Sequence, residues 1–131
     1  MSRHRTDIQP RFSDTDALGH INNQSFAAYA ELGRLDFVDH LFDRSVGTII
    51  LASLHLDFRR QVRFPEPMHI ETWVARVGTS SVTLQQAIYA GGERAADARS
   101  VIVYFDYAEG KPQALTPDIR TTLAPFIEAE V

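Results

Sequence analysis

The chain has 131 residues, 44% of them hydrophobic and 23% charged, a balance typical of one globular domain over residues 1–131 and not of a disordered segment. Its 17 acidic residues outnumber 13 Lys and Arg, and the net charge of −4 excludes the broad positive surface that nucleic-acid-binding proteins carry. Because there is no cysteine, disulfides, cysteine–zinc sites and thiol nucleophiles are excluded as well.

Nothing in the chain predicts export or membrane insertion. The N-terminal residues lack the apolar stretch of a secretory signal. The longest apolar run, Ile49 to Ala52, is far shorter than the roughly 20 residues that a membrane helix needs. We therefore expect a cytoplasmic protein without a membrane partner.

The first predicted elements are a strand and a long helix. Residues 3–12 read as a strand, which Pro10 limits to a sheet edge because proline has no N–H to donate. After the polar residues 13–22, apolar residues recur every three or four positions, which predicts a helix over roughly 23–43. Asn22 or Asn23 suits its N-cap, while Glu31 and Arg34 fall on the polar face, where an ion pair between them is the simplest interpretation.

Beyond the helix the apolar period changes from 3.6 to 2. Alternation over residues 54–59, 69–74, 82–89 and 98–105 predicts four strands joined by short turns, hence antiparallel neighbours. Gly91-Gly92 is a hairpin signal, since both glycines can adopt positive φ. Thr116-Pro117 predicts the start of a short helix that continues to about Ile127.

These elements predict an α+β fold in which one face of an antiparallel sheet covers the apolar stripe of the helix. The second sheet face also carries apolar side chains, among them Trp73, Val101, Val103 and Phe105. Such a surface is too apolar to be left in water, so we expect an oligomer.

The segment Arg11-Phe12-Ser13-Asp14-Thr15-Asp16-Ala17-Leu18-Gly19-His20-Ile21-Asn22-Asn23, continuing to Phe26, Tyr29, Glu31 and Arg34, resembles the signature of 4-hydroxybenzoyl-CoA thioesterase-like hotdog proteins. This resemblance implies a hotdog fold, a curved antiparallel sheet of about five strands wrapped around one long central helix. It also implies hydrolysis of acyl-CoA by a homodimer or homotetramer, without a metal and without a cofactor other than the coenzyme A of the substrate.

By this resemblance Asp16 is the catalytic carboxylate, acting as nucleophile or as general base on water, and the backbone N–H of Asn23 is the oxyanion donor. These roles agree with what thioester hydrolysis requires. A helix N-terminus offers free N–H groups and partial positive charge to the developing oxyanion, and Gly19 lets the chain turn closely into that terminus. Asp14 is the competing candidate for the catalytic carboxylate, and its alternative interpretation is a turn-stabilising residue at the end of a strand.

Further residues are assigned to substrate binding. The candidates are Gly19, His20, Asn22, Phe26, Ser80, Ser81, Arg59 and Arg60. The resemblance places Ser80 and Ser81 near the active site of a neighbouring subunit, and the arginines suit the phosphates of coenzyme A. Most of these candidates have a structural alternative. His20 would be a hydrogen-bonded structural histidine and Asn22 a helix cap. Ser80 and Ser81 would form a polar turn, and the arginines would be solvated charges at a strand edge.

The five histidines, at positions 4, 20, 40, 55 and 69, have no metal-ligand spacing, so the sequence predicts no metal site.

Two functions other than thioester hydrolysis stay open. A hotdog dehydratase acting on acyl-CoA or acyl-carrier protein is one rival, although its His and acidic pair belongs to a different motif. A non-catalytic acyl-CoA-binding hotdog module is the other. Release of a thiol from acyl-CoA separates both from a thioesterase.

Overall fold

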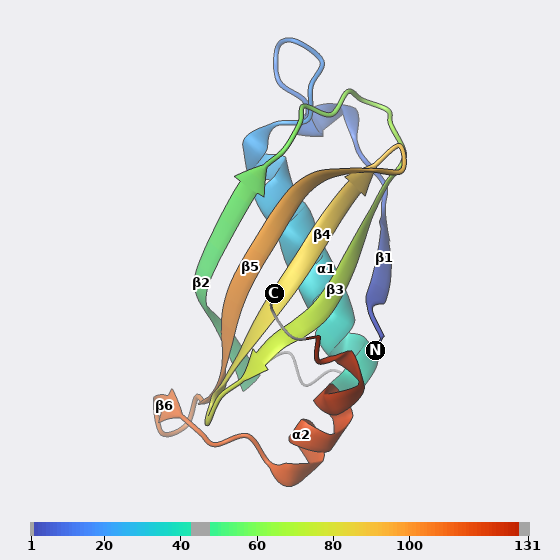
Figure 1. Cartoon of the computed structure of the whole chain (residues 1–131). Helices are drawn as coiled ribbons and strands as arrows, with labels where there is room; N and C mark the ends of the chain where they lie inside the picture. The colour runs from blue at the N-terminus through green and yellow to red at the C-terminus, as the bar shows by residue number, and fades with distance from the viewer. Residues whose placement is uncertain (1, 43–47, 129–131) are drawn as a thin grey trace.

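The computed structural model describes residues 2–42 and 48–128 and shows an antiparallel sheet that curves around a helix (Figure 1). The elements are β1 (His4–Ile8), η1 (Phe12–Asp14), α1 (Asn23–Phe42), β2 (Ile49–Phe58), β3 (Met68–Val77), β4 (Ser81–Ala90), β5 (Glu93–Asp106), β6 (Lys111–Pro112), α2 (Pro117–Leu123) and η3 (Ala124–Phe126). The predicted α+β class is confirmed.

The sheet has the strand order β1-β3-β4-β5-β2, with β6 paired to β5. About five strands were predicted and six are present, since the two-residue β6 is too short to show any apolar period. β1 is an edge strand, as predicted, but ends at Ile8, before Pro10. Phe12, the last residue of the predicted strand, instead begins the 3-10 helix η1.

Two turns follow the sequence signals directly. Gly91 and Gly92 have φ angles of 58° and 82° and join β4 to β5, so the predicted hairpin is confirmed. The hydroxyl of Thr116 accepts a hydrogen bond from the N–H of Ile119 at 3.2 Å, which caps α2 as predicted.

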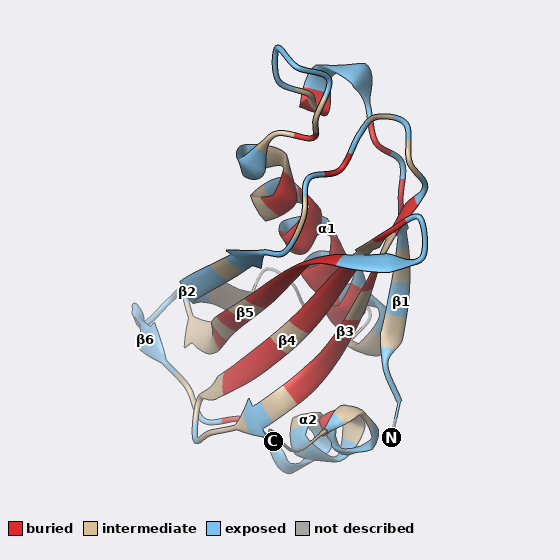
Figure 2. Ribbon diagram, turned by 45° about the horizontal axis from the view of Figure 1, so that its top comes forward, coloured by how far each residue is buried: buried red, intermediate tan, exposed pale blue. Residues whose placement is uncertain are grey.

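Helix α1 has 20 residues and lies across the sheet, with Phe26, Ala30, Gly33 and Phe37 buried. It begins at Asn23 as predicted; the predicted last residue, 43, lies outside the described residues. The sheet residues beneath it are also buried, as Figure 2 shows by the red stretches of β3, β4 and β5. Gln86 of β4 donates a hydrogen bond to the carbonyl of Ala30 at 3.0 Å, which joins the sheet to the helix backbone.

Two predicted exposures are wrong. Arg34 is only 4% exposed, and the described part of the chain shows no salt bridge between it and Glu31, although the charge of Glu31 favours the charged guanidinium. The buried stripe of the helix thus includes Arg34, beside Gly33. Trp73, predicted on an uncovered face, is 6% exposed, and the guanidinium of Arg3 lies 3.6 Å from its ring centroid.

Strand β2 begins earlier than predicted, at Ile49, and lies at the other edge of the sheet. One side pairs with β5; the other has no strand partner among the described residues. Leu51, Leu54 and Phe58 on this strand are 44%, 37% and 46% exposed. None of the helices in the described part of the chain is long and apolar enough to cross a membrane.

Candidate active site

Asp16 lies in a narrow loop between η1 and α1. The backbone N–H of Asp16 donates to the carbonyl of His20 at 2.8 Å, and Thr15 and Ile21 form an antiparallel bridge at the base of the loop. Gly19 has a φ of 83°, a conformation that a residue with a Cβ adopts only at a cost in free energy. The glycine therefore closes the loop, as the sequence predicted.

The chain that follows β2 holds this loop in place. The N–H of Ile21 donates to the carbonyl of Val62 at 2.7 Å, and the N–H of Phe64 donates to the carbonyl of Gly19 at 3.2 Å. His20 and Arg63 form a further antiparallel bridge. Residues 59–64 are thus a second wall beside the Asp16 loop, although they are about 40 positions away in the sequence.

The two carboxylate oxygens of Asp16 have different environments. Oδ1 accepts hydrogen bonds from the N–H of Leu18 at 2.8 Å and of His20 at 3.1 Å. Oδ2 has no hydrogen-bond donor within the described residues, and the side chain is exposed. The N–H groups of Leu18 and His20 hold the pKa of Asp16 below its ordinary value. An ionised carboxylate with one free oxygen therefore faces solvent.

The N-terminus of α1 leaves one N–H free. Asn22 is the N-cap: its Oδ1 accepts from the N–H of Gln24 at 2.8 Å, and its carbonyl accepts from the N–H of Ser25 at 2.9 Å. The N–H of Asn23 has no acceptor in the described ranges 2–42 and 48–128. It is therefore available to an external oxygen, at the positive end of the helix dipole.

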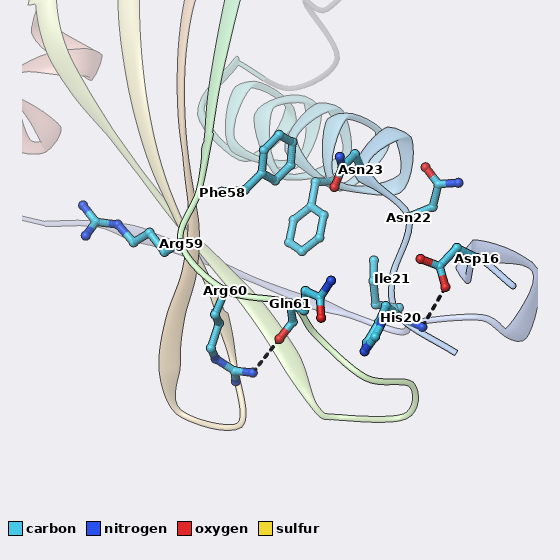
Figure 3. Close-up of a pocket in the computed structure, with 10 residues that line it drawn as sticks. Asp16, His20, Ile21, Asn22, Asn23, Phe58, Arg59, Arg60 and Gln61 are labelled. Carbon is cyan, nitrogen blue, oxygen red and sulfur yellow. Dashed lines mark hydrogen bonds between the residues drawn. The ribbon is translucent and has the colours of Figure 1, made fainter. Parts of the chain in front are cut away.

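These groups face one cavity of about 470 Å³ (Figure 3). The cavity is lined by Asp16, His20, Ile21, Asn22, Asn23, Phe26, Phe58, Arg59, Arg60 and Gln61. The structure thus brings together seven of the residues that the sequence nominated. Three lining residues were not nominated: Ile21, Phe58 and Gln61. Ile21 belongs to the signature segment and Phe58 is the last apolar position of the predicted strand, whereas Gln61 gives no signal in the sequence.

Three nominated residues lie elsewhere. Gly19 shapes the loop but does not line the cavity. Ser80 and Ser81 lie at the β3–β4 turn, at the opposite end of the sheet from the Asp16 loop (Figure 1). Within one chain they therefore do not meet Asp16, and the expectation that they act on a neighbouring subunit stays a prediction.

The nominated arginines differ in how many donors they have left. Arg60 donates to the carbonyls of Gln61 at 3.0 Å and Ala90 at 2.6 Å, and to Glu66 at 3.1 Å. Arg59, which points away from Asp16 in Figure 3, donates only through Nε, to the buried carboxylate of Asp97.

A third arginine, absent from the sequence-based set, completes this group. Arg94 also donates its Nε to Asp97, at 2.5 Å. The terminal nitrogens of Arg59 and Arg94 make no hydrogen bond in the described part of the chain, so both guanidinium groups present free donors to solvent. Asp97 thus holds two cations side by side, a geometry suited to phosphate.

No group of three or more His, Cys, Asp or Glu residues in the described part of the chain is arranged to hold a metal ion. His20 lines the cavity, and its buried Nδ1 has no partner there. The chemical capacity of the site thus comes from a free carboxylate oxygen, a free backbone N–H and a neighbouring imidazole.

Comparison with known proteins gives consistent matches. The family model described as the thioesterase-like superfamily matches residues 10–123. The uncharacterized protein YsmA of Bacillus subtilis (strain 168) is 30% identical over 123 residues, which are 88% of this chain and 82% of that protein. A predicted thioesterase from Bacillus stearothermophilus superposes with a TM-score of 0.92 at 28% identity, covering 99% of this chain and 100% of that one. A thioesterase from Thermus thermophilus, complexed with coenzyme A and Zn, has a TM-score of 0.86 at 27% identity, over 93% and 92% of the two chains.

Proposed function

The chain belongs to the thioesterase-like superfamily, and we propose that this protein is a cytoplasmic acyl-CoA thioesterase, which hydrolyses an acyl-CoA to the free acid and coenzyme A. The observation that carries the proposal is the pairing of two unused groups on one cavity. Asp16 Oδ2 has no donor and the N–H of Asn23 has no acceptor within the described residues, and both residues line the same wall. The related thioesterase that binds coenzyme A supports the substrate class.

In the proposed reaction the thioester carbonyl oxygen accepts the N–H of Asn23, which stabilises the negative charge of the tetrahedral intermediate. Asp16 Oδ2 attacks the carbonyl carbon and the C–S bond breaks, so that coenzyme A leaves as a thiolate that takes a proton from solvent. Water then hydrolyses the mixed anhydride and regenerates Asp16. No cofactor takes part.

The alternative is that Asp16 acts as general base and removes a proton from the attacking water. The hydrogen bonds that lower the pKa of Asp16 make it a weak base but keep it fully ionised near neutral pH. We therefore favour the nucleophile. A single turnover with excess enzyme in ¹⁸O-labelled water, repeated with hydroxylamine present, tests this. Label incorporated into Asp16, or an Asp16 hydroxamate, supports the anhydride, whereas label only in the product with no Asp16 hydroxamate supports the base.

We propose that Arg59 and Arg94, and not Arg60, contact the phosphates of coenzyme A, since their terminal nitrogens are free. Arg94→Gln should raise the KM for an acyl-CoA by on the order of fivefold and leave the KM for the matching acyl-pantetheine, which lacks these phosphates, unchanged. Arg76→Gln, at an exposed position of β3, is the control. An equal change for both substrates would contradict the phosphate contact.

The unpaired edge of β2 supports a homodimer, which two such dimers would extend to a homotetramer. An exposed apolar edge strand is a site for pairing with another strand. Antiparallel pairing of two β2 edges would bring the Ser80–Ser81 turn of one copy toward the Asp16 loop of the other, because turn and loop lie at opposite ends of the sheet (Figure 1). Sedimentation that shows only monomer at micromolar concentration would contradict this assembly.

The test of the reaction class is thiol release from a panel of aromatic, short-chain and medium-chain acyl-CoAs. We expect turnover of at least one class and its loss in a folded Asp16 variant. Hydration of an enoyl-CoA without thiol release would favour a dehydratase, and binding of coenzyme A thioesters without turnover would favour a non-catalytic module. Either result would overturn the proposal.

A further inference from the structure

Asp14 is a buried carboxylate that the proposed reaction does not use. Its side chain accepts three hydrogen bonds. Oδ2 accepts from the Tyr29 hydroxyl at 2.6 Å and from the Arg11 backbone N–H at 3.0 Å, and Oδ1 accepts from the Arg11 guanidinium at 3.1 Å. Burial alone would raise the pKa of Asp14, but the hydrogen bonds from Tyr29 and Arg11 outweigh burial and hold that pKa below its ordinary value. The group is therefore a fixed anion and not a proton donor.

The backbone of Asp14 is joined to the first turn of α1. Its carbonyl accepts hydrogen bonds from the N–H of Asn22 at 2.8 Å and from the hydroxyl of Ser25 at 3.0 Å. Asn22 directly precedes the N–H of Asn23, and Asp16 follows Asp14 by two residues. One buried residue thus connects the segment that carries the carboxylate to the segment that carries the free N–H.

We propose that Asp14 and Tyr29 are positioning residues, a buried latch that fixes Asp16 relative to the N–H of Asn23. This inference rests on the proposed function. A hydrogen bond to a buried carboxylate is short and strong, and Tyr29 lies on α1 one turn beyond Ser25, so the latch attaches the loop to the rigid body of the helix. The separation of attacking oxygen and oxyanion donor has to be held closely, because small misplacements lower kcat strongly.

The latch acts from behind the cavity. Asp14 and Tyr29 do not line the cavity that contains Asp16; both line a groove on the other side of the loop, between β1 and α1. They therefore do not touch the substrate. Weakening the latch should leave substrate binding intact and disturb only the geometry of the reacting groups, which separates kcat from KM.

The experiment compares Tyr29→Phe, which removes one hydroxyl, with wild type. We expect kcat for thiol release to fall about tenfold while KM changes less than about twofold. We also expect the acidic limb of the kcat/KM profile to move to higher pH. Looser N–H contacts from Leu18 and His20 would stabilise the Asp16 anion less and let its pKa rise. Tyr107→Phe, whose hydroxyl donates to the carbonyl of Ile49 at 3.1 Å, is the matched control.

Amide exchange gives a readout that does not depend on activity. In Tyr29→Phe the N–H groups of Leu18, His20 and Asn22 should exchange at least about tenfold faster, with the amides in the interior of α1 unchanged. Asp14→Asn should give a larger effect on the same groups; if it does not fold, Tyr29→Phe carries the test.

The outcomes separate the two proposals. If wild type releases no thiol from any acyl-CoA, the proposed function fails, and with it the catalytic meaning of the latch. If wild type is active but folded Tyr29→Phe keeps its kcat, its pH profile and its amide protection, the latch alone is overturned. A lower melting temperature with unchanged kcat and unchanged acidic limb also overturns it, because the pair would then serve stability only.

Discussion

The most direct prediction concerns Asp16→Asn. The amide oxygen of asparagine can take the place of Oδ1 and accept the same N–H groups of Leu18 and His20, which lie 2.8 and 3.1 Å from it. The loop should therefore keep its shape, while the free Oδ2 is replaced by an NH₂ group that can neither attack a carbonyl nor remove a proton. We expect kcat to fall at least ~100-fold with little change in KM.

Asp16→Ala removes the same oxygen and also Oδ1, the one acceptor of the two N–H groups that close the loop. It should lose kcat to a similar extent and also raise KM, since the loop is no longer held. Asp106→Asn is a matched control, because Oδ1 of Asp106 accepts the N–H groups of Ala108 at 3.0 Å and Glu109 at 3.1 Å in a turn that does not line the cavity. Its kcat should equal that of wild type.

The assay is thiol release from an acyl-CoA, followed as a function of pH. Because the pKa of Asp16 is lowered, wild-type kcat/KM should not decline from protonation of Asp16 until the pH is below the ordinary range for an aspartate. Folded Asp16→Asn with wild-type turnover would refute the reasoning. So would an acidic limb near neutral pH that titrates with Asp16 itself.

Three further predictions concern stability. Gly33→Ala would place a Cβ 2.8 Å from Nε2 of the buried Gln86, so we expect a loss of about 1–3 kcal/mol in urea unfolding, although alanine favours an isolated helix by about 1 kcal/mol. Arg3→Ala uncovers Trp73, and the emission of this single tryptophan should shift to longer wavelength with about 1 kcal/mol lost. Thr116→Ala removes the cap of α2 and should cost about 1 kcal/mol in thermal unfolding.

Each of these has a contrary result. A more stable Gly33→Ala protein would mean that Gln86 moves aside without losing its hydrogen bond to the helix. Unchanged emission in Arg3→Ala would mean that the guanidinium does not cover the indole. An unchanged unfolding midpoint in Thr116→Ala would show that the hydrogen bond of the cap is replaced by water.

Much of the secondary structure could be predicted because its causes are local. The change of apolar period from 3.6 to 2 located α1, β3 and β4 to within a few residues, whereas β2 and β5 each start five residues earlier than predicted. Gly91 and Gly92 can adopt positive φ angles because glycine has no Cβ, a property that is known from the sequence alone. By contrast, β6 is two residues long and leaves no period to detect.

Burial could not be predicted where distant segments decide it. Arg34 has the residue type of a solvated helix face, yet it lies in the buried stripe of α1. Trp73 reads as an uncovered side chain, yet Arg3, which is 70 positions earlier, lies on it. The need for a glycine at position 33 could not be predicted either, since it arises from the Gln86 side chain of β4, which would lie 2.8 Å from a Cβ there.

For the candidate site, the sequence by itself determined the part that is contiguous: the loop with Asp16, the closing glycine at position 19 and the helix start at Asn23, because turn geometry and helix capping depend on neighbouring residues. Only the tertiary structure decided what faces that loop and what holds it. The opposite wall comes from the end of β2, and the latch joins Asp14 to Tyr29 through the folded interior. Such contacts depend on how β2, α1 and the sheet pack in space, which no local pattern of residues encodes.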